Sequence, residues 1–460
     1  MGDSKPRLFS RRDIAKIMVP MIFQQILTVF ITMADSVMVS HTGEAAFAGV
    51  SLVSSLDTFL LTLFTALTAG GSVVLAQLMG QGHREETRAA AKQLLYASSA
   101  VALAVTVLVL LLRVPLLNFL FGDAEAAVLY NARSYFSIIA LSFPFLAIEY
   151  SVSAIFRVQG DSMIALKISI GMNLLNIAGN ALLIYGAGLG AVGAALATLF
   201  SRFVGAVVMI CIGHNKKRFI YIDKLFHYKP DWRTIKRILK IGVPNGIENS
   251  MFQLGRLLTS SLVSSLGQAV IAANAATLQL ANFQYNAGAA VQTTMVTVVG
   301  RCVGAEEKKQ AKRYSWTLLG VGYLLVIAIV GVTCLFSRPF LGLFNLTEET
   351  FLLARSLLLW HGLFSAILWP AAFCLPPAFR AASDVRFTMI ISIVSMWCFR
   401  VALAYVLAPE TVSLFGILSF SGAGLSIMGV WIGMAADWLF RAVVFVLHFL
   451  RGKWLEKYSA

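Results

Sequence analysis

Long apolar runs alternate with short polar loops along almost the whole chain. Each run is long enough to cross the roughly 30 Å hydrocarbon core of a bilayer as a helix, and several contain Gly or Pro, which membrane helices tolerate. The runs fall at roughly 14–40, 50–79, 93–112, 131–156, 163–186, 190–213, 239–263, 270–300, 314–336, 350–378, 386–408 and 424–450. The pattern predicts an all-α membrane protein with twelve transmembrane helices. The first run is too long for a signal peptide and contains Asp35, so we expect it to be retained as a helix.

The chain repeats itself once, with an offset of 224 between matching positions. These positions are Val19-Pro20 with Val243-Pro244, Gly43 with Gly267, Gly80 with Gly304 and, at an offset of 223, the loops Arg157 to Asp161 and Arg380 to Asp384. Six spans per copy is an even number, so both copies enter the membrane in the same direction. This predicts two six-helix lobes related by a pseudo-two-fold axis along the membrane normal, an architecture typical of secondary transporters.

The predicted boundaries place the N-lobe (TM1–TM6) at 1–213, a basic cytoplasmic linker at 214–238 and the C-lobe (TM7–TM12) at 239–460. In such transporters the ligand binds between the lobes near the midplane. Access then alternates as one lobe rocks against the other.

Composition and charge are typical of an integral membrane protein. Hydrophobic residues make up 58% and charged residues 13% of the sequence, against about 25% charged in soluble domains. With the N-terminus inside, the cytoplasmic segments carry 29 Lys and Arg residues and the opposite side carries four. The positive-inside rule therefore predicts a multi-pass cell-membrane protein (the inner membrane of a bacterium) with both termini cytoplasmic. The net charge of +15 lies in loops, so it indicates contact with lipid head groups and not with nucleic acid.

One acid stands inside the first span on a polar stripe. Gln24, Thr28 and Thr32 precede Asp35 at helical spacing, so the stripe should face the bundle interior. A carboxylate at mid-membrane costs roughly 2.5–3.5 kcal/mol on insertion scales, so it must be neutralised, paired or hydrated. We expect Asp35 to exchange a proton, whose place Na⁺ could take; the alternative is an acid paired for helix packing.

Amide and hydroxyl groups mark the fifth and sixth spans. Asn176 and Asn180 lie one turn apart on one helix face, and Thr198 follows in the next span. Their oxygens could bind a hard cation or a carboxyl group. They could equally hold helices together, as small and amide side chains do in membranes.

The second half has a polar set of its own. Span 7 carries Glu248, Gln253 and Arg256, and span 8 carries Asn282 and Asn286 on one face. These residues are candidates for the substrate cavity, together with the stripe of the first span. Glu248 and Arg256 are two turns apart, and an internal ion pair is as good an interpretation as a ligand site.

The polar motifs resemble the multidrug and toxic compound extrusion (MATE) family over roughly 14–450. The resemblance rests on Met33-Ala34-Asp35-Ser36-Val37-Met38-Val39 with Gly43 and Ala46, Gln77 to Gly82, Arg157 with Gly160-Asp161, Asn176 to Asn180, Gly190 to Ala195 with Ala197-Thr198, and Gly429-Val430-Trp431. It implies export of amphiphilic, often cationic compounds against inward H⁺ or Na⁺ flow. Beyond the coupling ion it implies no cofactor.

The family's cation site carries over to Asp35, Asn176 and Thr198. At position 180 many members have Asp where this chain has Asn180, which leaves Asp35 as the clear acid of the site. The C-lobe has no equivalent: Thr259 stands at the repeat position of Asp35, and the Asn176/Asn180 face has no counterpart around Arg400. We therefore place the coupling ion in the N-lobe and expect a monomer with a small-molecule amphiphilic substrate.

Two other classes of function have less support in the sequence. A flippase for a lipid-linked saccharide or another amphipathic lipid precursor would keep the fold, and Arg256 and Arg400 could then hold a phosphate. An enzyme is not expected, because the six histidines form no metal-binding pair and there is no Gly-rich phosphate loop.

Overall fold

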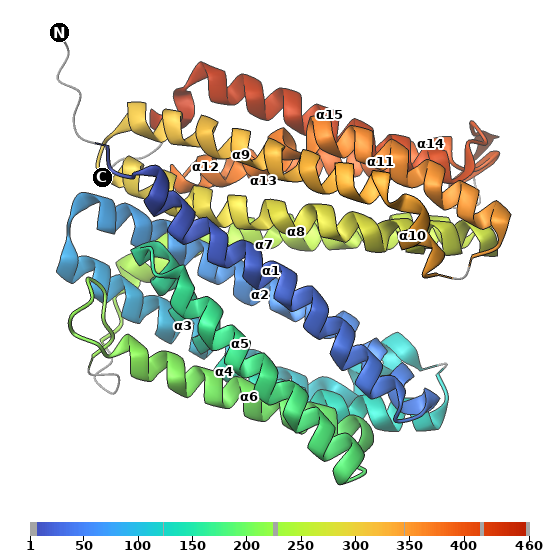
Figure 1. The fold of residues 1–460 in the computed structure, drawn as a ribbon, viewed down its shortest axis with the longest axis horizontal. Helices are drawn as coiled ribbons and strands as arrows, with labels where there is room; N and C mark the ends of the chain where they lie inside the picture. The colour runs from blue at the N-terminus through green and yellow to red at the C-terminus, as the bar shows by residue number, and fades with distance from the viewer. Residues whose placement is uncertain (1–6, 123, 224–228, 345, 415–417, 457–460) are drawn as a thin grey trace. The chain divides into compact units, whose positions relative to one another are not determined.

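A computed structural model describes residues 7–122, 124–223, 229–344, 346–414 and 418–456, and helices make up almost all of it (Figure 1). Within these residues, ten helices are long and apolar enough to cross a membrane. The two other long helices, α7 (Trp232–Ser264) and α8 (Gln268–Gly304), coincide with the expected spans 7 and 8, which carry the most polar residues. The expectation of a helical multi-pass membrane protein is confirmed, with ten of the twelve spans meeting the apolar criterion.

The N-terminal unit, Phe9–Gly246, is a helical bundle. Its helices are α1 (Arg11–Ser40), α2 (Glu44–Gln81), α3 (Arg84–Phe121), α4 (Ala126–Gln159), α5 (Ser162–Asn180), the π-helix η1 (Ala181–Gly186) and α6 (Gly190–Gly213). Helix α4 packs against α2, α3 and α6, and α5 packs against α1 and α6. The core between α2 and α4 is aromatic, with Phe64 and Phe143 fully buried and their ring centroids 5.9 Å apart. This packing sets α5 beside α1, so polar residues of the two helices can meet.

The C-terminal unit, Ile247–Ala460 together with the first residues up to Leu8, contains the remaining helices and one hairpin. They are α9 (Lys308–Leu335), α10 (Ser337–Gly342), α11 (Glu348–Cys374), α12 (Pro376–Ala381), α13 (Val385–Val394), η2 (Ser395–Val401), α14 (Ala402–Leu407), β1 (Thr411–Leu414), β2 (Leu418–Ser421), α15 (Ser426–Arg451) and η3 (Lys453–Glu456). Helix α8 packs against α9 and α11, while α15 packs against α11, α14 and η2. Arg400 on η2 is thereby placed beside α15.

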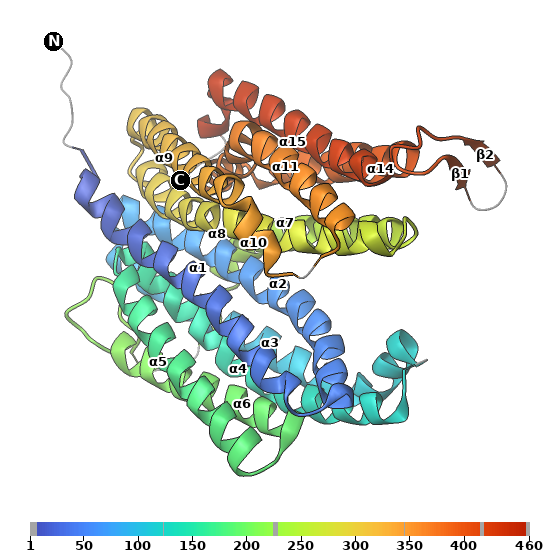
Figure 2. The same cartoon turned by 45° about the vertical axis from the view of Figure 1, so that its right-hand side comes forward.

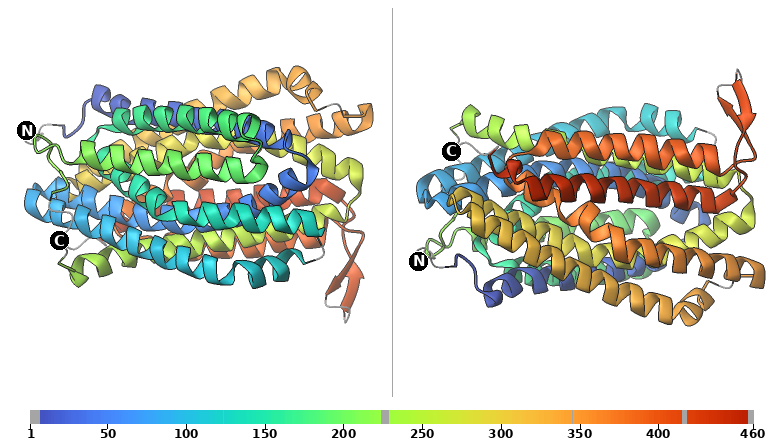
Figure 3. Two further views of the ribbon diagram at one scale, coloured as in Figure 1. Left: turned by 90° about the horizontal axis from the view of Figure 1, so that it is seen from below. Right: turned by 90° about the horizontal axis from the view of Figure 1, so that it is seen from above.

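The antiparallel β1–β2 hairpin is the one departure from helix among the described elements, and the apolar pattern did not predict it. It pairs Thr411 with Ser421 and lies beyond the ends of α14 and α15 (Figures 2 and 3). It belongs to the connection between these helices and leaves the expected spans unchanged.

The junctions between helices repeat in geometry as well as in sequence. Gly43 before α2 and Gly267 before α8 have φ of 105° and 102°, a backbone conformation that only glycine adopts readily. At the turns after α4 and α12, the Asp161 amide donates to the Phe156 carbonyl and the Asp384 amide donates to the Phe379 carbonyl, both at 2.9 Å. The sequence repeat is therefore also a repeat of local structure.

The division between the two units falls inside α7, after Gly246. The first half of α7 belongs to the N-terminal unit because its backbone comes very close to α2. A Cβ added at Gly70 would lie 2.6 Å from the Ile238 carbonyl oxygen, so a side chain there could not be accommodated without a shift. The described start of the expected linker also belongs to this unit, where the Gln159 side chain both donates to and accepts from the Ile220 backbone (3.1 and 3.0 Å).

Candidate functional site

The four residues expected to couple the ion form one chain of hydrogen bonds in the N-terminal unit. The Asn180 amide nitrogen donates to Asp35 Oδ1 (2.8 Å) and to Asn176 Oδ1 (3.3 Å). The Asn176 nitrogen donates to Thr198 Oγ1 (3.2 Å), which in turn donates to the Ala194 carbonyl (3.0 Å). Three helices, α1, α5 and α6, thus meet through side chains at a single acid.

The two asparagines of this hydrogen-bond chain are buried, and one of their oxygens is an unused acceptor. Asn180 is 1% exposed and Asn176 is 6% exposed, whereas Asp35 and Thr198 are half-buried. Asn180 Oδ1 has no hydrogen-bond partner in the described structure, although a buried polar atom normally has one. The chain therefore ends at an oxygen that another donor could use.

Asn180 is also the last residue of α5 before the π-helix η1. π-helical turns are rare and frequently occur at functional sites. The apolar pattern predicted one continuous span at 163–186 and gave no signal for this irregularity, because the residues of η1 are as apolar as those of α5.

The polar stripe of α1 satisfies part of its hydrogen bonding within its own helix. The Thr28 hydroxyl donates to the Gln24 carbonyl and the Thr32 hydroxyl donates to the Thr28 carbonyl, each at 2.9 Å. Thr28 and Thr32 are exposed in the described structure, and Gln24 is half-buried. The threonines thus leave their oxygens as acceptors, and their role in a substrate cavity stays a prediction.

An ion pair lies in the same unit, on the helix that carries Thr198. Arg202 on α6 lies 3.8 Å from Asp57 on α2 and donates to the Ser142 hydroxyl at 2.7 Å. The charge of Arg202 is thus paired with Asp57, whereas Asp35 is held by the Asn180 amide.

The polar residues of α7 have different partners from those expected. Glu248 forms an ion pair with Arg380 of α12 (3.4 Å). Of the two interpretations left open by the sequence, an ion pair of Glu248 with Arg256 is not formed, because two turns separate these residues by about 12 Å along the helix. Tertiary packing instead brings Arg380 to Glu248, which the spacing within one helix could not show.

Glu248 and Arg380 line a cavity of about 180 Å³ in the C-terminal unit, together with Asn249, Gln292 and Arg441. Arg256 lines a separate cavity of about 60 Å³. Gln253 and Asn286 are half-buried and Asn282 is exposed. The structure thus places Glu248 and Arg256 at two different cavities, and substrate binding by the whole set stays a prediction.

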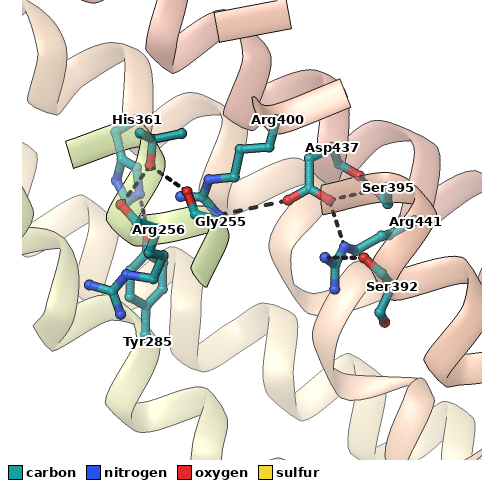
Figure 4. A network of polar contacts seen from close by, with 10 residues as sticks. Gly255, Arg256, Tyr285, His361, Ser392, Ser395, Arg400, Asp437 and Arg441 are labelled. Atoms are coloured by element: carbon teal, nitrogen blue, oxygen red, sulfur yellow. Dashed lines mark hydrogen bonds and ion pairs between the residues drawn. The ribbon is translucent and has the colours of Figure 1, made fainter. Parts of the chain in front are cut away.

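A buried ion network in the C-terminal unit was not predicted from the sequence. Asp437 on α15 is fully buried and lies between two arginines (Figure 4). Its Oδ1 accepts from Arg441 Nε (2.7 Å) and from the Ser395 hydroxyl (2.5 Å), and its Oδ2 lies 3.7 Å from Arg400. The spacing of Asp437 and Arg441, one helical turn apart, was the available signal.

Aromatic side chains surround His361 in the C-terminal unit. The Tyr285 hydroxyl lies 2.6 Å from His361 Nε2, and the rings of Trp431 and Trp438 contact the imidazole edge-on. A cavity of about 130 Å³ is lined by Trp360, His361, Trp431 and Trp438. Within the described residues, no group of three or more His, Cys, Asp or Glu side chains could hold a metal ion.

A family model described as MatE matches residues 20–182 and again 244–406, so that its two matches stand in the same register as the internal repeat. The chain belongs to the MatE family. The resemblance seen in the sequence motifs is thereby confirmed, and so is its consequence that the chain is a multi-pass membrane transporter.

Relatives of known sequence match over nearly the whole chain. A probable multidrug resistance protein NorM of Thermotoga maritima is 26% identical over 454 residues, which cover 97% of this chain and 94% of that protein. A probable NorM of Bacillus licheniformis is 27% identical over 446 residues, 94% of each chain. The uncharacterized transporter YisQ of Bacillus subtilis is 25% identical over 450 residues, 95% of this chain and 94% of YisQ.

Solved structures share the fold of this MatE chain. An outward-facing multidrug resistance MATE transporter of the MOP superfamily superposes with a TM-score of 0.87 at 21% identity, over 97% of this chain and 96% of that chain. A MOP superfamily transporter from Pyrococcus furiosus, described as having a binding pocket of reversed polarity, gives 0.85 at 21% identity over 97% of each chain. None of these relatives and solved structures is described as a lipid-precursor flippase.

Proposed function

We propose that this MatE chain is a secondary active antiporter that exports amphiphilic, cationic compounds in exchange for inward H⁺ or Na⁺. The observation that carries the proposal is the series of hydrogen bonds that links Asp35, Asn180, Asn176 and Thr198. Asp35 is half-buried, accepts from the neutral Asn180 amide and forms no ion pair within the described residues, so a mobile cation can serve as its counter-charge.

The hydrogen bonds suggest how a proton would change the site. The charged Asp35 carboxylate accepts from the Asn180 nitrogen, whereas a protonated carboxyl group has an O–H to donate. Rotation of the Asn180 amide would present its unpartnered Oδ1 to that O–H and withdraw its nitrogen from Asn176. Protonation at α1 would in this way alter the packing of α5 and α6 and bias the equilibrium between inward- and outward-open states.

Na⁺ would need more oxygens than this arrangement offers. In the described structure the donor side of the Asn180 amide, not its oxygen, faces Asp35. The same amide rotation would supply one further oxygen for a hard cation. The geometry therefore favours H⁺ as the coupling ion. Coupling to Na⁺ is the alternative that the experiment below must exclude.

Efflux from proteoliposomes tests the proposal. The purified protein is reconstituted, and a panel of cationic dyes is followed under an imposed pH gradient and, separately, under a Na⁺ gradient. We expect the pH gradient to drive efflux; efflux driven by Na⁺ alone would assign Na⁺ to Asp35. Dye movement that depends on neither gradient would contradict the proposal.

We further propose that the transporter works as a monomer with both termini in the cytoplasm.

A further inference from the structure

One polar cluster of the C-terminal unit holds more positive than negative charge. Arg400 and Arg441 share the single carboxylate of Asp437, whose best hydrogen bonds go to Arg441 and Ser395. Arg256 forms no ion pair with any residue that the structure describes. Two guanidiniums therefore share one acid, and the exposed Arg256 adds a third positive charge beside Arg400. Unpaired charge inside a membrane span is costly, so a further anion would stabilise this cluster.

Arg256 and Arg400 belong to one cavity. Both line the space of about 60 Å³. Thr259, Ser260 and Asn274 contribute polar atoms to the same walls. The volume suits a carboxylate, sulfonate or phosphate group. It is too small for a whole drug-sized molecule, whose pockets measure about 300–1,000 Å³.

Two glycines bring the helices close enough to form this cavity. A Cβ at Gly255 on α7 would lie 2.9 Å from Met396 Cγ on η2, and a Cβ at Gly433 on α15 would lie 3.0 Å from the Arg400 carbonyl oxygen. The π-helix η2 is thus held between α7 and α15. Figure 4 shows Arg256 and Arg400 on either side of Gly255, with Arg400 reaching toward Asp437.

The internal repeat places this cavity where the N-terminal unit has its acid. The repeat offset of 224 takes Asp35 to Thr259 and Asn176 to Arg400, and both of these line the cavity. With the offset of 223 seen in the preceding loop, Arg400 instead matches Ile177, the next residue. At the offset of 224, one copy of the repeat therefore has an acid and an amide where the other has a neutral hydroxyl and a guanidinium.

We propose that Arg256 and Arg400 form a binding site for the anionic group of an amphiphilic substrate, so that the transporter also accepts anionic or zwitterionic compounds. The site refines the substrate class of the proposed function and rests on it for transport, although binding can be measured alone. Trp431 and Met434 line both this cavity and the aromatic one beside it, so an apolar body has a matching surface next to the anion site.

Binding of two probes that differ only in charge tests the site. The full-length protein in phosphatidylcholine nanodiscs is titrated by calorimetry with 1-naphthalenesulfonate and with 1-naphthylmethylammonium. We expect Arg256→Gln to weaken sulfonate binding at least about tenfold, because a charge-assisted hydrogen bond is lost, and Arg256→Lys to weaken it less. Arg338→Gln, which removes an exposed arginine on α10, should change nothing.

A second pair of variants does not remove an arginine. Thr259→Asp places a carboxylate beside Arg256 and Arg400, as at the matching position of the first copy, and should compete with the sulfonate. Thr259→Asn has nearly the same volume without the charge and should retain binding. Equal sulfonate affinity in these two variants, wild-type affinity in Arg256→Gln, or no sulfonate binding by the wild type would each overturn the site.

The binding measurement separates a failure of the anion site from a failure of the proposed transport function. It also tells the added sulfonate apart from a lipid phosphate as the occupant of the site. Binding needs no gradient, so its failure leaves gradient-driven efflux of a cationic dye unaffected, and failed efflux leaves binding measurable. Weaker sulfonate binding in nanodiscs of anionic phosphatidylglycerol would identify a lipid phosphate as an occupant of the same site.

Discussion

The Asn180 side chain donates to Asp35 at 2.8 Å with its nitrogen while its oxygen remains buried without a partner. A side-chain amide offers a donor and an acceptor on neighbouring atoms, and rotation of the amide exchanges their positions. Asn180 can therefore hydrogen-bond to either protonation state of the acid. This relationship makes the site of the N-terminal unit responsive to a proton, and two predictions follow from it.

Asp35→Asn should abolish coupled efflux while the protein remains folded in the membrane. The asparagine keeps the size of the side chain but cannot exchange a proton, so an imposed pH gradient has nothing to act on. Dye efflux from proteoliposomes measures the effect, and membrane yield and thermal unfolding serve as controls. Wild-type efflux in this variant would refute the role of Asp35.

Asn180→Asp should shift the coupling toward Na⁺. It places a second carboxylate next to Asp35, where two like charges at hydrogen-bond distance must share a proton or a cation. The added charge should tighten Na⁺ binding by about tenfold, since ligand charge is a main determinant of affinity at oxygen sites. The Na⁺ dependence of efflux is the measurement, with Asn173→Asp, one turn before Asn176, as the control. No gain of Na⁺ response over that control would count against the cation site.

Asp437→Asn should destabilise the protein by about 3–5 kcal/mol, because it leaves buried arginines without their counter-charge. The matched control is Asp161→Asn, which removes the acid of the more exposed Asp161–Arg218 pair and should cost at most about 1 kcal/mol. Thermal unfolding in detergent compares the two variants. Equal unfolding temperatures would mean that Asp437 is not the electrostatic centre of its cluster.

Gly433→Ala should also destabilise the protein, by about 1–3 kcal/mol, because the new methyl group meets the backbone of η2. Gly331→Ala on α9 is the matched control, since a Cβ there meets nothing within 4 Å. The control should be neutral or slightly stabilising, as Ala has the higher helix propensity. If both variants unfold alike, the contact between α15 and η2 is not tight.

Much of the fold could be predicted from the sequence, because membrane spans are encoded locally. The expected span 190–213 coincides with α6, and Asn176 and Asn180 share a hydrogen-bonded face as their spacing predicts. The partners of charges could not be predicted in this way. Glu248 on α7 pairs with Arg380 on α12, which is distant in the sequence, because tertiary packing and not the helical period decides that contact.

The π-helices escaped prediction for a related reason. They change the number of residues in a turn without requiring a particular residue type. The residues of η1 are apolar, and those of η2 include Arg400, so no common sequence signal marks the two. The contact between Asp35 and Asn180 depends on how α1 packs beside α5. The motifs suggested this contact through the family resemblance, and spacing along one helix could not have specified it.

The turn after α12 preserves a record of how the two halves diverged. Ser383 adopts a φ of 67° where the first copy has Gly160 at 93°, a conformation that is unfavourable for any residue with a Cβ. The second copy has the same shape of turn without the glycine that makes this shape easy. The two copies thus share a backbone geometry that tolerates different side chains, which is how a repeated segment can present an acid in one half and guanidiniums in the other.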